Sequence, residues 1–273
     1  MQHLRAIAEQ AARAGGEVLA THAGRVTGVR LKSGSADMVS AADIASGVTV
    51  VRSIATALPD ARFVVEEPEV YELASVTPGA LHDDAVWVID PLDGTTSFVH
   101  GYPCYSVSVA LLHAGRPVAG AVYNVPAGEM ISAVAGGGAT RDGAPLRCTG
   151  AGTISEALLG TGFPYDRGAP LDRQLRIFRR LMSAAHDIRR DGSAAVDLCH
   201  VAVGRTDGFW EVGLRTWDTA AGALIVMESG GLVTGFDGGP WTTATTDVVA
   251  ANPALHAELI EVIAEAERES HGS

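Results

Sequence analysis

The stretch WVIDPLDGTTSF, residues 87–98, decides more about this chain than any other segment. An apolar run ends at Asp90, and Pro91 is expected to end the strand because proline has no N–H to donate to a central ladder. Asp93 begins a predicted turn three residues after Asp90. Two carboxylates at this spacing can converge on one point, with the carbonyl of Leu92 between them. An all-oxygen site of this kind suits a hard cation such as Mg²⁺.

The next two residues, Gly94 and Thr95, are suited to binding a phosphate group. Gly94 and Thr95 would present backbone N–H groups, and Thr95 also a hydroxyl, to an anion held beside the cation. Asp93-Gly94 is equally typical of an ordinary turn in which the aspartate side chain caps the backbone. A short motif of this kind often occurs without any ligand, so the segment alone does not establish a site.

Two other acidic positions stand at the ends of predicted elements. Glu66 and Glu67 follow a short apolar strand over residues 62–65, and Asp218 opens an Ala/Gly-rich helix. Acids that follow a buried strand are commonly solvated loop residues. An aspartate in the first turn of a helix is commonly a cap that the helix dipole stabilises. Each position, taken alone, therefore has a purely structural interpretation.

Taken in chain order, these segments resemble the inositol monophosphatase family of Mg²⁺-dependent, lithium-sensitive phosphatases. The resemblance rests mainly on two long motifs, DPLDGTTSFVHGYP at 90–103 and WDTAAGALIVMESGG at 217–231. Shorter matching segments are Lys32 with DMVSAAD at 37–43, EE at 66–67, GSAA at 192–195, FWE at 209–211 and VAAN at 249–252. Together they span nearly the whole chain in the expected order.

The resemblance implies an α/β layered fold, namely a five-layered αβαβα sandwich, and usually a homodimer. It also implies hydrolysis of a small phosphate monoester by a water molecule that two or three Mg²⁺ ions activate. The chain departs from the family pattern at two positions. Val65 stands where Gly is common before the Glu pair, and Ser97 stands where Asn is frequent. The pattern favours Glu66 over Glu67 as the metal ligand.

The resemblance further implies roles for individual residues. The implied metal ligands are Glu66, Asp90, the carbonyl of Leu92, Asp93 and Asp218. The implied catalytic residues are Asp43, Glu66 and Thr95, with Asp43 and Thr95 orienting and deprotonating the attacking water. Substrate contacts are implied for Lys32, Asp93, Gly94, Thr95, Gly192, Ser193, Ala194, Glu211 and Asp218.

Several substrates are compatible with this chemistry. Inositol 1-phosphate is the leading candidate, because Glu211 in the segment FWEVG favours a polyol or an amine as the alcohol half. Histidinol phosphate, a sugar phosphate and a nucleotide 3′-phosphate remain alternatives. A regulatory binding module on the same scaffold is a third hypothesis, but all the metal carboxylates that an enzyme would need are present.

The composition limits the classes of partner. The 273 residues include 20 Lys and Arg against 32 Asp and Glu, a net charge of −12, which argues against a nucleic-acid or anionic-membrane surface. Hydrophobic residues make up 47%, enough for a large core. The three cysteines form no CxxC pair, and the N-terminal residues lack the apolar run of a signal peptide. We therefore expect a soluble, cytoplasmic enzyme whose partner is a small phosphorylated metabolite.

Hydrophobic periodicity predicts helices and strands mixed in both halves. Helices are expected over residues 4–19, 41–58, 171–189, 193–203 and 217–229, with a last one opening at Asn252-Pro253. Strands are expected over 62–65, 86–89, 105–112, 118–123, 157–160, 208–213, 233–236 and 248–251. Residues 136–138 are expected to form a hairpin turn, and 32–37 a mobile loop. A boundary near 140–152 divides the chain into residues 1–140, which carry the metal loop, and 141–273, which complete the site.

Overall fold

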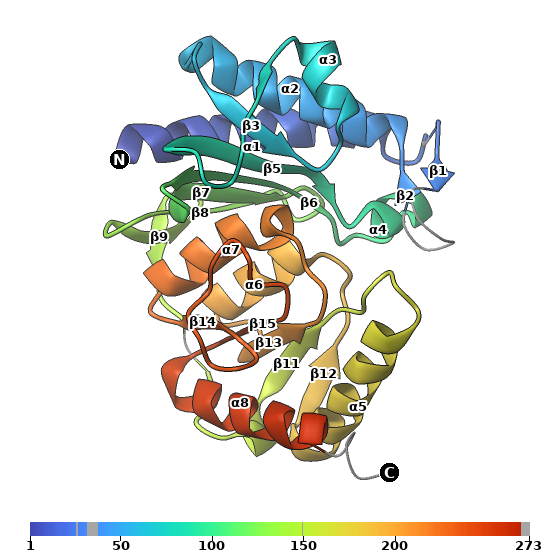
Figure 1. Ribbon diagram of the computed structural model, residues 1–273, viewed down its shortest axis with the longest axis vertical. Coiled ribbons are helices and arrows are strands. Elements are labelled where there is room, and N and C mark those ends of the chain that lie inside the picture. The colour runs from blue at the N-terminus through green and yellow to red at the C-terminus, as the bar shows by residue number, and fades with distance from the viewer. Residues whose placement is uncertain (26, 32–37, 149, 269–273) are drawn as a thin grey trace.

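Two β-sheets and three layers of helices stack in the order α, β, α, β, α (Figure 1). The computed structural model describes residues 1–25, 27–31, 38–148 and 150–268. Helices α1 (Gln2–His22) and α2 (Ala41–Ala57) cover the outer face of the first sheet, and α6 (Ala194–Ala202) and α7 (Thr216–Glu228) lie between the sheets. The α/β layered, five-layered sandwich expected from the sequence is therefore confirmed.

The first sheet has eight strands in the order β10-β9-β8-β7-β6-β5-β3-β4. Their bounds are β3 Arg62–Val65, β4 Thr77–Pro78, β5 Ala85–Asp93, β6 Ser106–His113, β7 Arg116–Asn124, β8 Glu129–Val134, β9 Gly138–Arg141 and β10 Ala144–Leu146. Strand β3 runs parallel to β4 and β5, and all the pairings from β5 to β10 are antiparallel. Strands β1 (Arg30–Leu31) and β2 (Met38–Val39) pair separately.

Side chains of β5 alternate between the two faces of this sheet. Val86 and Val88 pack in the core that contains α6 and α7, whereas Trp87 and Ile89 pack in the core that contains α1 and α2. A strand with helices on both faces reads as a continuous apolar run rather than as an alternation of apolar and polar residues. The run of buried residues in β5 continues to Leu92 and so brings the acidic segment to the edge of the core.

The second sheet has five strands in the order β12-β11-β13-β15-β14. Their bounds are β11 Leu158–Thr161, β12 Asp187–Arg189, β13 Gly208–Glu211, β14 Leu232–Gly235 and β15 Val248–Ala251. Helices α5 (Ala169–Ala184) and α8 (Pro253–Arg268) cover its outer face (Figure 1). The remaining elements are short: α3 Glu69–Ala74, α4 Thr95–His100 and the 3₁₀ turn Ile154–Glu156.

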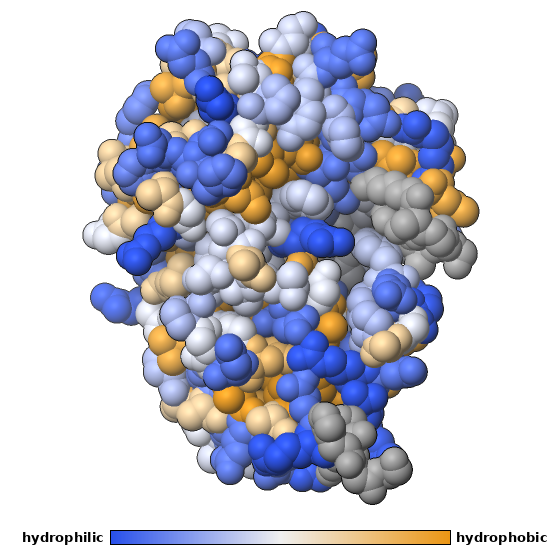
Figure 2. Space-filling view, viewed as in Figure 1, coloured by the Kyte–Doolittle hydropathy of each residue, from blue (hydrophilic) through white to orange (hydrophobic). Residues whose placement is uncertain are grey.

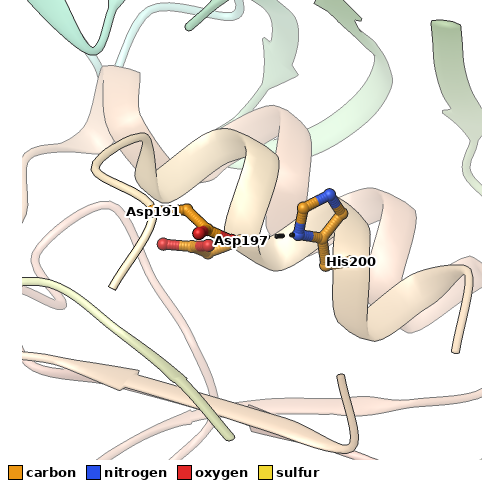
Figure 3. Close-up of side chains that lie close together, drawn as sticks. All are labelled: Asp191, Asp197 and His200. Carbon is orange, nitrogen blue, oxygen red and sulfur yellow. Dashed lines mark ion pairs between the residues drawn. The ribbon is translucent and has the colours of Figure 1, made fainter. Parts of the chain in front are cut away.

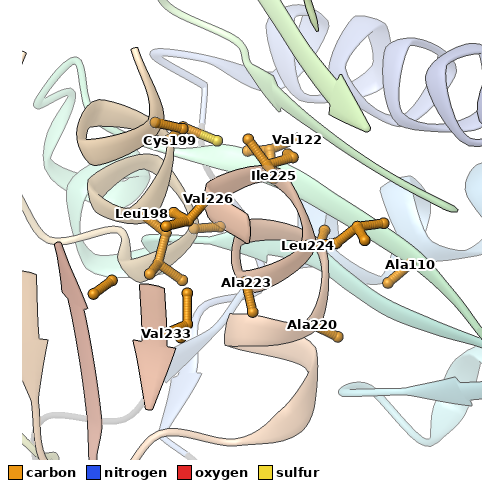
Figure 4. Close-up of a cluster of buried hydrophobic side chains, with 14 of the residues drawn as sticks. Ala110, Val122, Leu198, Cys199, Ala220, Ala223, Leu224, Ile225, Val226 and Val233 are labelled. Carbon is orange, nitrogen blue, oxygen red and sulfur yellow. The ribbon is translucent and has the colours of Figure 1, made fainter. Parts of the chain in front are cut away.

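The middle layer is buried on both sides, which explains why α7 is apolar around most of its circumference. Small residues let α6 and α7 pack closely, since a Cβ at Gly222 would lie 2.6 Å from a methyl carbon of Leu198. Figure 4 shows these two helices packed against Val122 of the first sheet and Val233 of the second. The two sheets therefore share one core through α6 and α7.

The outer surface is a mixture of polar and apolar side chains. On the face drawn in Figure 2, orange residues lie in small groups between blue ones. Within the described ranges, none of the helices combines the length and the apolar character that crossing a bilayer requires.

One predicted strand end was wrong. Strand β5 continues through Pro91 to Asp93 instead of ending at Asp90. The register between β5 and β6 shifts between Asp90, which lies opposite Ser108, and Asp93, which lies opposite Ser106. This bulge takes the proline out of the regular ladder, so its missing N–H costs no hydrogen bond.

One predicted helix was too long. Helix α5 ends at Ala184 rather than at Arg189, because Ala185 is extended at φ −81° and ψ 163°. Residues Asp187–Arg189 instead form β12, which pairs in parallel with β11. The hairpin turn at 136–138 is confirmed, since Val134 of β8 faces Gly138 of β9. Strands β8 and β9 themselves were not predicted from the sequence.

Two other expectations are not tested by the fold. The loop 32–37, including Lys32, lies outside the described residues. The division into residues 1–140 and 141–273 stays a prediction.

Candidate active site

Predicted site residues from both sheets line one cleft of about 640 Å³, although Asp43, Asp90, Leu92, Gly94 and Thr95 are not among its lining residues. Glu66 and Asp93 line it from the first sheet, and Glu211 and Asp218 line it from the second sheet and the helix α7. The segment Gly192–Ala194 at the start of α6 closes another side. Residues far apart in the sequence therefore converge where the ends of β3, β5 and β13 meet the first turns of α6 and α7.

The bulge in β5 fixes the two aspartates of the DPLD segment. Asp90 is 2% exposed, and its Oδ1 accepts a hydrogen bond of 3.0 Å from the backbone N–H of Leu92. The carbonyl of Pro91 is held by the hydroxyl of Ser46 in α2, at 2.8 Å. These contacts hold the backbone between the two acids in place.

Glu66 and Asp218 reach the same place from other elements. The backbone N–H of Glu66 donates to the carbonyl of Ile89 at 3.2 Å, which extends the parallel pairing of β3 with β5 and places Glu66 beside Asp90. Asp218 lies in the first turn of α7, where its Oδ2 accepts from the backbone N–H of Arg215 at 2.6 Å. Glu67, by contrast, is 2% exposed and does not line the cleft.

Glu66, Asp90, Asp93 and Asp218 form an acidic cluster, and the pKa values of its three aspartates are raised. Burial, followed by the charges of Glu66, Asp93 and Asp218, raises the pKa of Asp90 well above its usual range. Burial, followed by the charge of Asp93, does the same to the pKa of Asp218. Burial also raises the pKa of Asp93 to about 6, although hydrogen bonds from Ser193 and Ala195 oppose the increase.

This donor set fits a hard divalent cation. Buried carboxylates that repel one another lose that repulsion when a cation lies between them. All the donors are oxygens, the preferred ligands of Mg²⁺, and the carbonyl of Leu92 lies between the two aspartates in the chain. Among the described residues, ligand atoms of Asp191, Asp197 and His200 lie within 4.8 Å of one another. In the same part of the chain, no three carboxylates of the acidic cluster lie this close to one another.

A threonine–aspartate pair stands beside the acidic cluster. The hydroxyl of Thr95 lies 2.9 Å from Oδ1 of Asp43 and 3.1 Å from the carbonyl of Leu92. Asp43 is 1% exposed, and its Oδ2 accepts from the backbone N–H of Ser40 at 2.9 Å and from its hydroxyl at 2.5 Å. Ser40 and Asp43 form the capping box that begins α2. The helix terminus thus fixes the carboxylate that faces Thr95.

Burial sets the proton affinity of Asp43. It raises the pKa of this carboxyl, and the hydrogen bonds from Ser40 and Thr95 act in the opposite direction. A carboxylate with a raised pKa accepts a proton more readily than one in water does. A hydroxyl that donates to Asp43 also keeps its lone pairs for a water molecule.

Two glycines allow the two segments that are predicted to contact phosphate, residues 94–95 and 192–194, to approach each other. Gly94 has φ +95°, and a Cβ there would lie 2.9 Å from the carbonyl oxygen of Cys104 and 3.1 Å from that of Gly192. Gly192 has φ +98°. Both conformations favour glycine, and at Gly94 the close approach of two backbone oxygens leaves no room for a side chain.

Hydrogen bonds connect the start of α6 to Asp93, one of the predicted metal ligands. The hydroxyl of Ser193 donates to Oδ2 of Asp93 at 2.6 Å, and the backbone N–H of Ala195 donates to the same oxygen at 2.7 Å. These bonds link the two predicted segments across about a hundred residues of sequence. Ser193 also accepts from the backbone N–H of Val196 at 3.3 Å and so caps the helix.

Glu211 ends β13 and lines the cleft on the side of Asp218. Its carboxylate packs against Gly162, where a Cβ would collide with it. Burial raises the pKa of Glu211 to about 8, the charge of Asp93 adds to the increase, and Arg190 opposes it. Glu211 is thus a buried acid that shares its surroundings with the acidic cluster.

Some cleft residues were missed or left open by the sequence analysis. Arg190 lines the cleft, whereas its neighbour Arg189 pairs with Asp187, so only the second arginine is placed to meet an anion. Tyr165 and Asp197 also line the cleft. Tyr165 follows the end of β11, which pairs in parallel with β13. Its position after a strand that ends beside Glu211 could have indicated that Tyr165 lies near the cleft.

Comparison with known proteins finds relatives that match nearly the whole chain. The profile of the Inositol monophosphatase family matches residues 1–268. The chain is 37% identical over 258 residues to the inositol-1-monophosphatase of Synechocystis, covering 94% of this chain and 88% of that protein. It is 40% identical over 266 residues to the Nus factor SuhB of Pseudomonas aeruginosa, covering 96% of each chain.

A solved structure gives the same result for the fold. The inositol monophosphatase of Anabaena superposes with a TM-score of 0.83 at 35% identity, covering 97% of this chain and 96% of that one. Sequence and fold agree in supporting phosphatase activity with metal-dependent chemistry. The chain belongs to the inositol monophosphatase family.

Proposed function

We propose that this protein hydrolyses a small phosphate monoester with Mg²⁺, and that inositol 1-phosphate is its preferred substrate. The observation that carries the proposal is that Glu66, Asp93, Asp218 and Glu211 line one cleft, while the Thr95–Asp43 pair is held beside the acidic segment by the carbonyl of Leu92. Family membership and the name of the Synechocystis relative support it. A net charge of −12 does not favour a nucleic-acid surface, although other relatives are named Nus factors.

Glu66, Asp90, the carbonyl of Leu92, Asp93 and Asp218 would hold two or three Mg²⁺ ions. When bound, these ions supply Lewis-acid stabilisation of the phosphate and lower the pKa of a bound water. The four carboxylates alone would repel a phosphate dianion, so the cation charge is needed for the substrate to enter.

The protein's own groups would prepare the attacking water. Thr95 accepts a hydrogen bond from that water while its hydroxyl donates to Asp43. Asp43, whose pKa burial raises, takes up the proton that the water releases. The capping box holds Asp43 in place, so the pair is preorganised before substrate binds.

The substrate would lie between two sets of contacts. Gly94, Thr95, Gly192, Ser193 and Ala194 would contact the phosphate, as would Lys32, which lies outside the described residues. Glu211 accepts hydrogen bonds from hydroxyl or amine groups of the alcohol half, on the side of Asp218. We also propose that the enzyme is cytoplasmic, homodimeric and inhibited by Li⁺.

The Glu211→Gln variant tests the substrate assignment. Loss of the carboxyl group should raise KM for inositol 1-phosphate about tenfold or more, at about 1.4 kcal/mol per decade. Hydrolysis of p-nitrophenyl phosphate should stay nearly unchanged, because that ester has no hydroxyls to bind. Glu17→Gln, an exposed exchange on α1, is the matched control.

Each outcome has a clear meaning. Equal losses on both esters would assign Glu211 to the metals or to the fold, and no loss on either would remove the support for a polyol. A panel containing histidinol phosphate, sugar phosphates and a nucleotide 3′-phosphate would show whether another ester is preferred. Absence of Mg²⁺-dependent turnover on every ester would contradict phosphatase activity itself.

A further inference from the structure

A second group of potential metal ligands lies beside the cleft, around the start of α6. Asp191 directly precedes Gly192. Asp197 and His200 lie on α6, three residues apart and therefore on one face of the helix. One ligand atom from each of the three side chains lies within 4.8 Å of the other two. Figure 3 shows the two carboxylates close together, with the imidazole directed at Asp191 across 3.7 Å between Nδ1 and Oδ2.

Asp197 lacks a hydrogen-bond partner that would explain its burial. The residue is 1% exposed, and no group in the described part of the chain bonds to either of its carboxylate oxygens. A buried carboxyl of this kind costs several kcal/mol unless it is paired or neutralised. Asp197 also lines the cleft, so its oxygens are buried next to a space that a small ion can reach.

The surrounding charges make a cation the fitting partner. Burial raises the pKa of Asp197 well above its usual range, and the carboxylates of Asp191, Glu211 and Asp93 raise it further. Arg190 acts in the opposite direction but forms no hydrogen bond with the Asp197 oxygens. Burial lowers the pKa of His200, which keeps its ring neutral and able to ligate a metal near pH 7.

We propose that Asp191, Asp197 and His200 bind a borderline transition-metal cation such as Zn²⁺, at a site separate from the acidic cluster. One imidazole and two carboxylates suit Zn²⁺ or Mn²⁺, whereas the all-oxygen cluster suits Mg²⁺. Three protein ligands leave the fourth zinc position for water. Ligands at about 2.0–2.2 Å from one zinc stand about 3.4 Å apart, so small side-chain rotations complete the site.

The site has an entry path and a structural consequence. The side chains of Asp191 and His200 are 26% and 18% exposed, so the ion can enter from solvent. Once bound, it would fasten Asp191 to the first two turns of α6 and thereby hold Gly192 and Ser193 between them. The phosphate segment would become more rigid without any new contact to substrate.

Zinc binding in the presence of saturating Mg²⁺ is the test. Mg²⁺ occupies the oxygen sites, and equilibrium dialysis counts the Zn²⁺ that remains bound to wild type, Asp197→Asn and His200→Gln. Wild type should bind one more Zn²⁺ than either variant, and each variant should lose affinity at this site about 100-fold or more. His186→Gln, an exchange of an exposed histidine in the same half, should bind like wild type.

Thermal unfolding and Co²⁺ absorption provide readouts that do not depend on activity. Zinc at 100-fold excess over its dissociation constant should raise Tm of wild type by about 5 °C or more and leave both variants unchanged. Bound Co²⁺ should show a visible band that changes in His200→Gln, because a nitrogen ligand is lost. Equal Zn²⁺ binding by wild type and both variants, or no Zn²⁺ binding by wild type, would overturn the proposal. Asp197→Asn is isosteric, and His200→Gln keeps the test valid should the first variant misfold.

Discussion

Asp90 is buried, and its burial together with the charges of Glu66, Asp93 and Asp218 raises the pKa of its carboxyl well above the usual range. Asp90→Asn should lower kcat on the order of 10³-fold or more, because it weakens a ligand of metals that stabilise the transition state. The fold should remain, and Tm in chelator should equal or exceed that of wild type, since a repelled buried carboxyl has been removed. Steady-state kinetics with Mg²⁺ and thermal unfolding with EDTA measure the two effects.

Asp84→Asn provides the control for this exchange, because Asp84 is exposed and precedes the same strand. It should keep wild-type kcat and Tm. If Asp90→Asn retained a tenth of wild-type kcat, a loss of only about 1.4 kcal/mol, the assignment of Asp90 as a metal ligand would be wrong.

Residues within one motif were predictable, whereas their distant partners were not. The spacing of Asp90 and Asp93 placed two acids and a carbonyl within four residues, and the structure holds these residues at the bulge of β5. The bond from Ser193 to Asp93 joins residues 100 positions apart and depends on the packing of both halves. Asp197 reads as an ordinary polar residue in a helix, and only the fold shows that it is buried beside the cleft.

At the scale of elements, the turn between β5 and α4 depends on a single glycine. Gly94→Ala should lower the free energy of unfolding by about 2 kcal/mol or more, because a Cβ at φ +95° would also lie 2.9 Å from a backbone oxygen of Cys104. Activity should fall with it, since the residues on either side are the ones proposed to bind metal and water. Denaturant unfolding and kcat are the measurements.

Gly101→Ala tests the same conformation without the collision. Gly101 ends α4 at φ +70°, and nothing lies within 4 Å of its Cβ position. Its replacement should cost about 1 kcal/mol and leave kcat unchanged. Equal losses in the two variants would mean that conformation alone, and not the close approach of the two halves, requires glycine at 94.

Element type followed from the sequence wherever the apolar period was long, as in α1, α2 and α8. Strands β8, β9 and β10 were missed: β9 and β10 contain few residues, and glycines stand at positions 128, 136–138 and 143 beside the three strands. Strand β12 was absorbed into the predicted helix α5, since Ile188 continues an apolar helical period. Its strand state is set by pairing with β11, a contact that no local pattern contains.

At the scale of the whole molecule, the buried acids link stability to pH. Folding raises the pKa of Glu211 to about 8 and that of Asp93 to about 6, both above the unfolded values near 4. The folded chain therefore holds protons that the unfolded chain has released. Their contribution is complete below about pH 4 and is lost as pH rises through 6 and 8.

The metal-free protein should accordingly become less stable by a few kcal/mol between pH 5 and pH 9. Thermal unfolding in EDTA across this range measures the decline, and Glu211→Gln should make it shallower. Added Mg²⁺ should restore stability most at the high-pH end, where the carboxylates are ionised and bind the cation. Stability that increased from pH 5 to pH 9 in EDTA would contradict the raised pKa values.

The position of α6 and α7 between the sheets also has a consequence for the order in which the protein is made. The first sheet is complete at Leu146, yet the helices that cover its inner face end at Glu228. Synthesis of the intervening segment, roughly 80 residues at about 5–20 residues per second, takes on the order of 4–16 s. Throughout that interval Val88, Leu112 and Ile131 belong to a face whose cover has not yet been translated. While it is still attached to the ribosome, the growing chain thus exposes the apolar inner face of its first sheet for seconds. A chaperone that binds the chain at this stage would bind there.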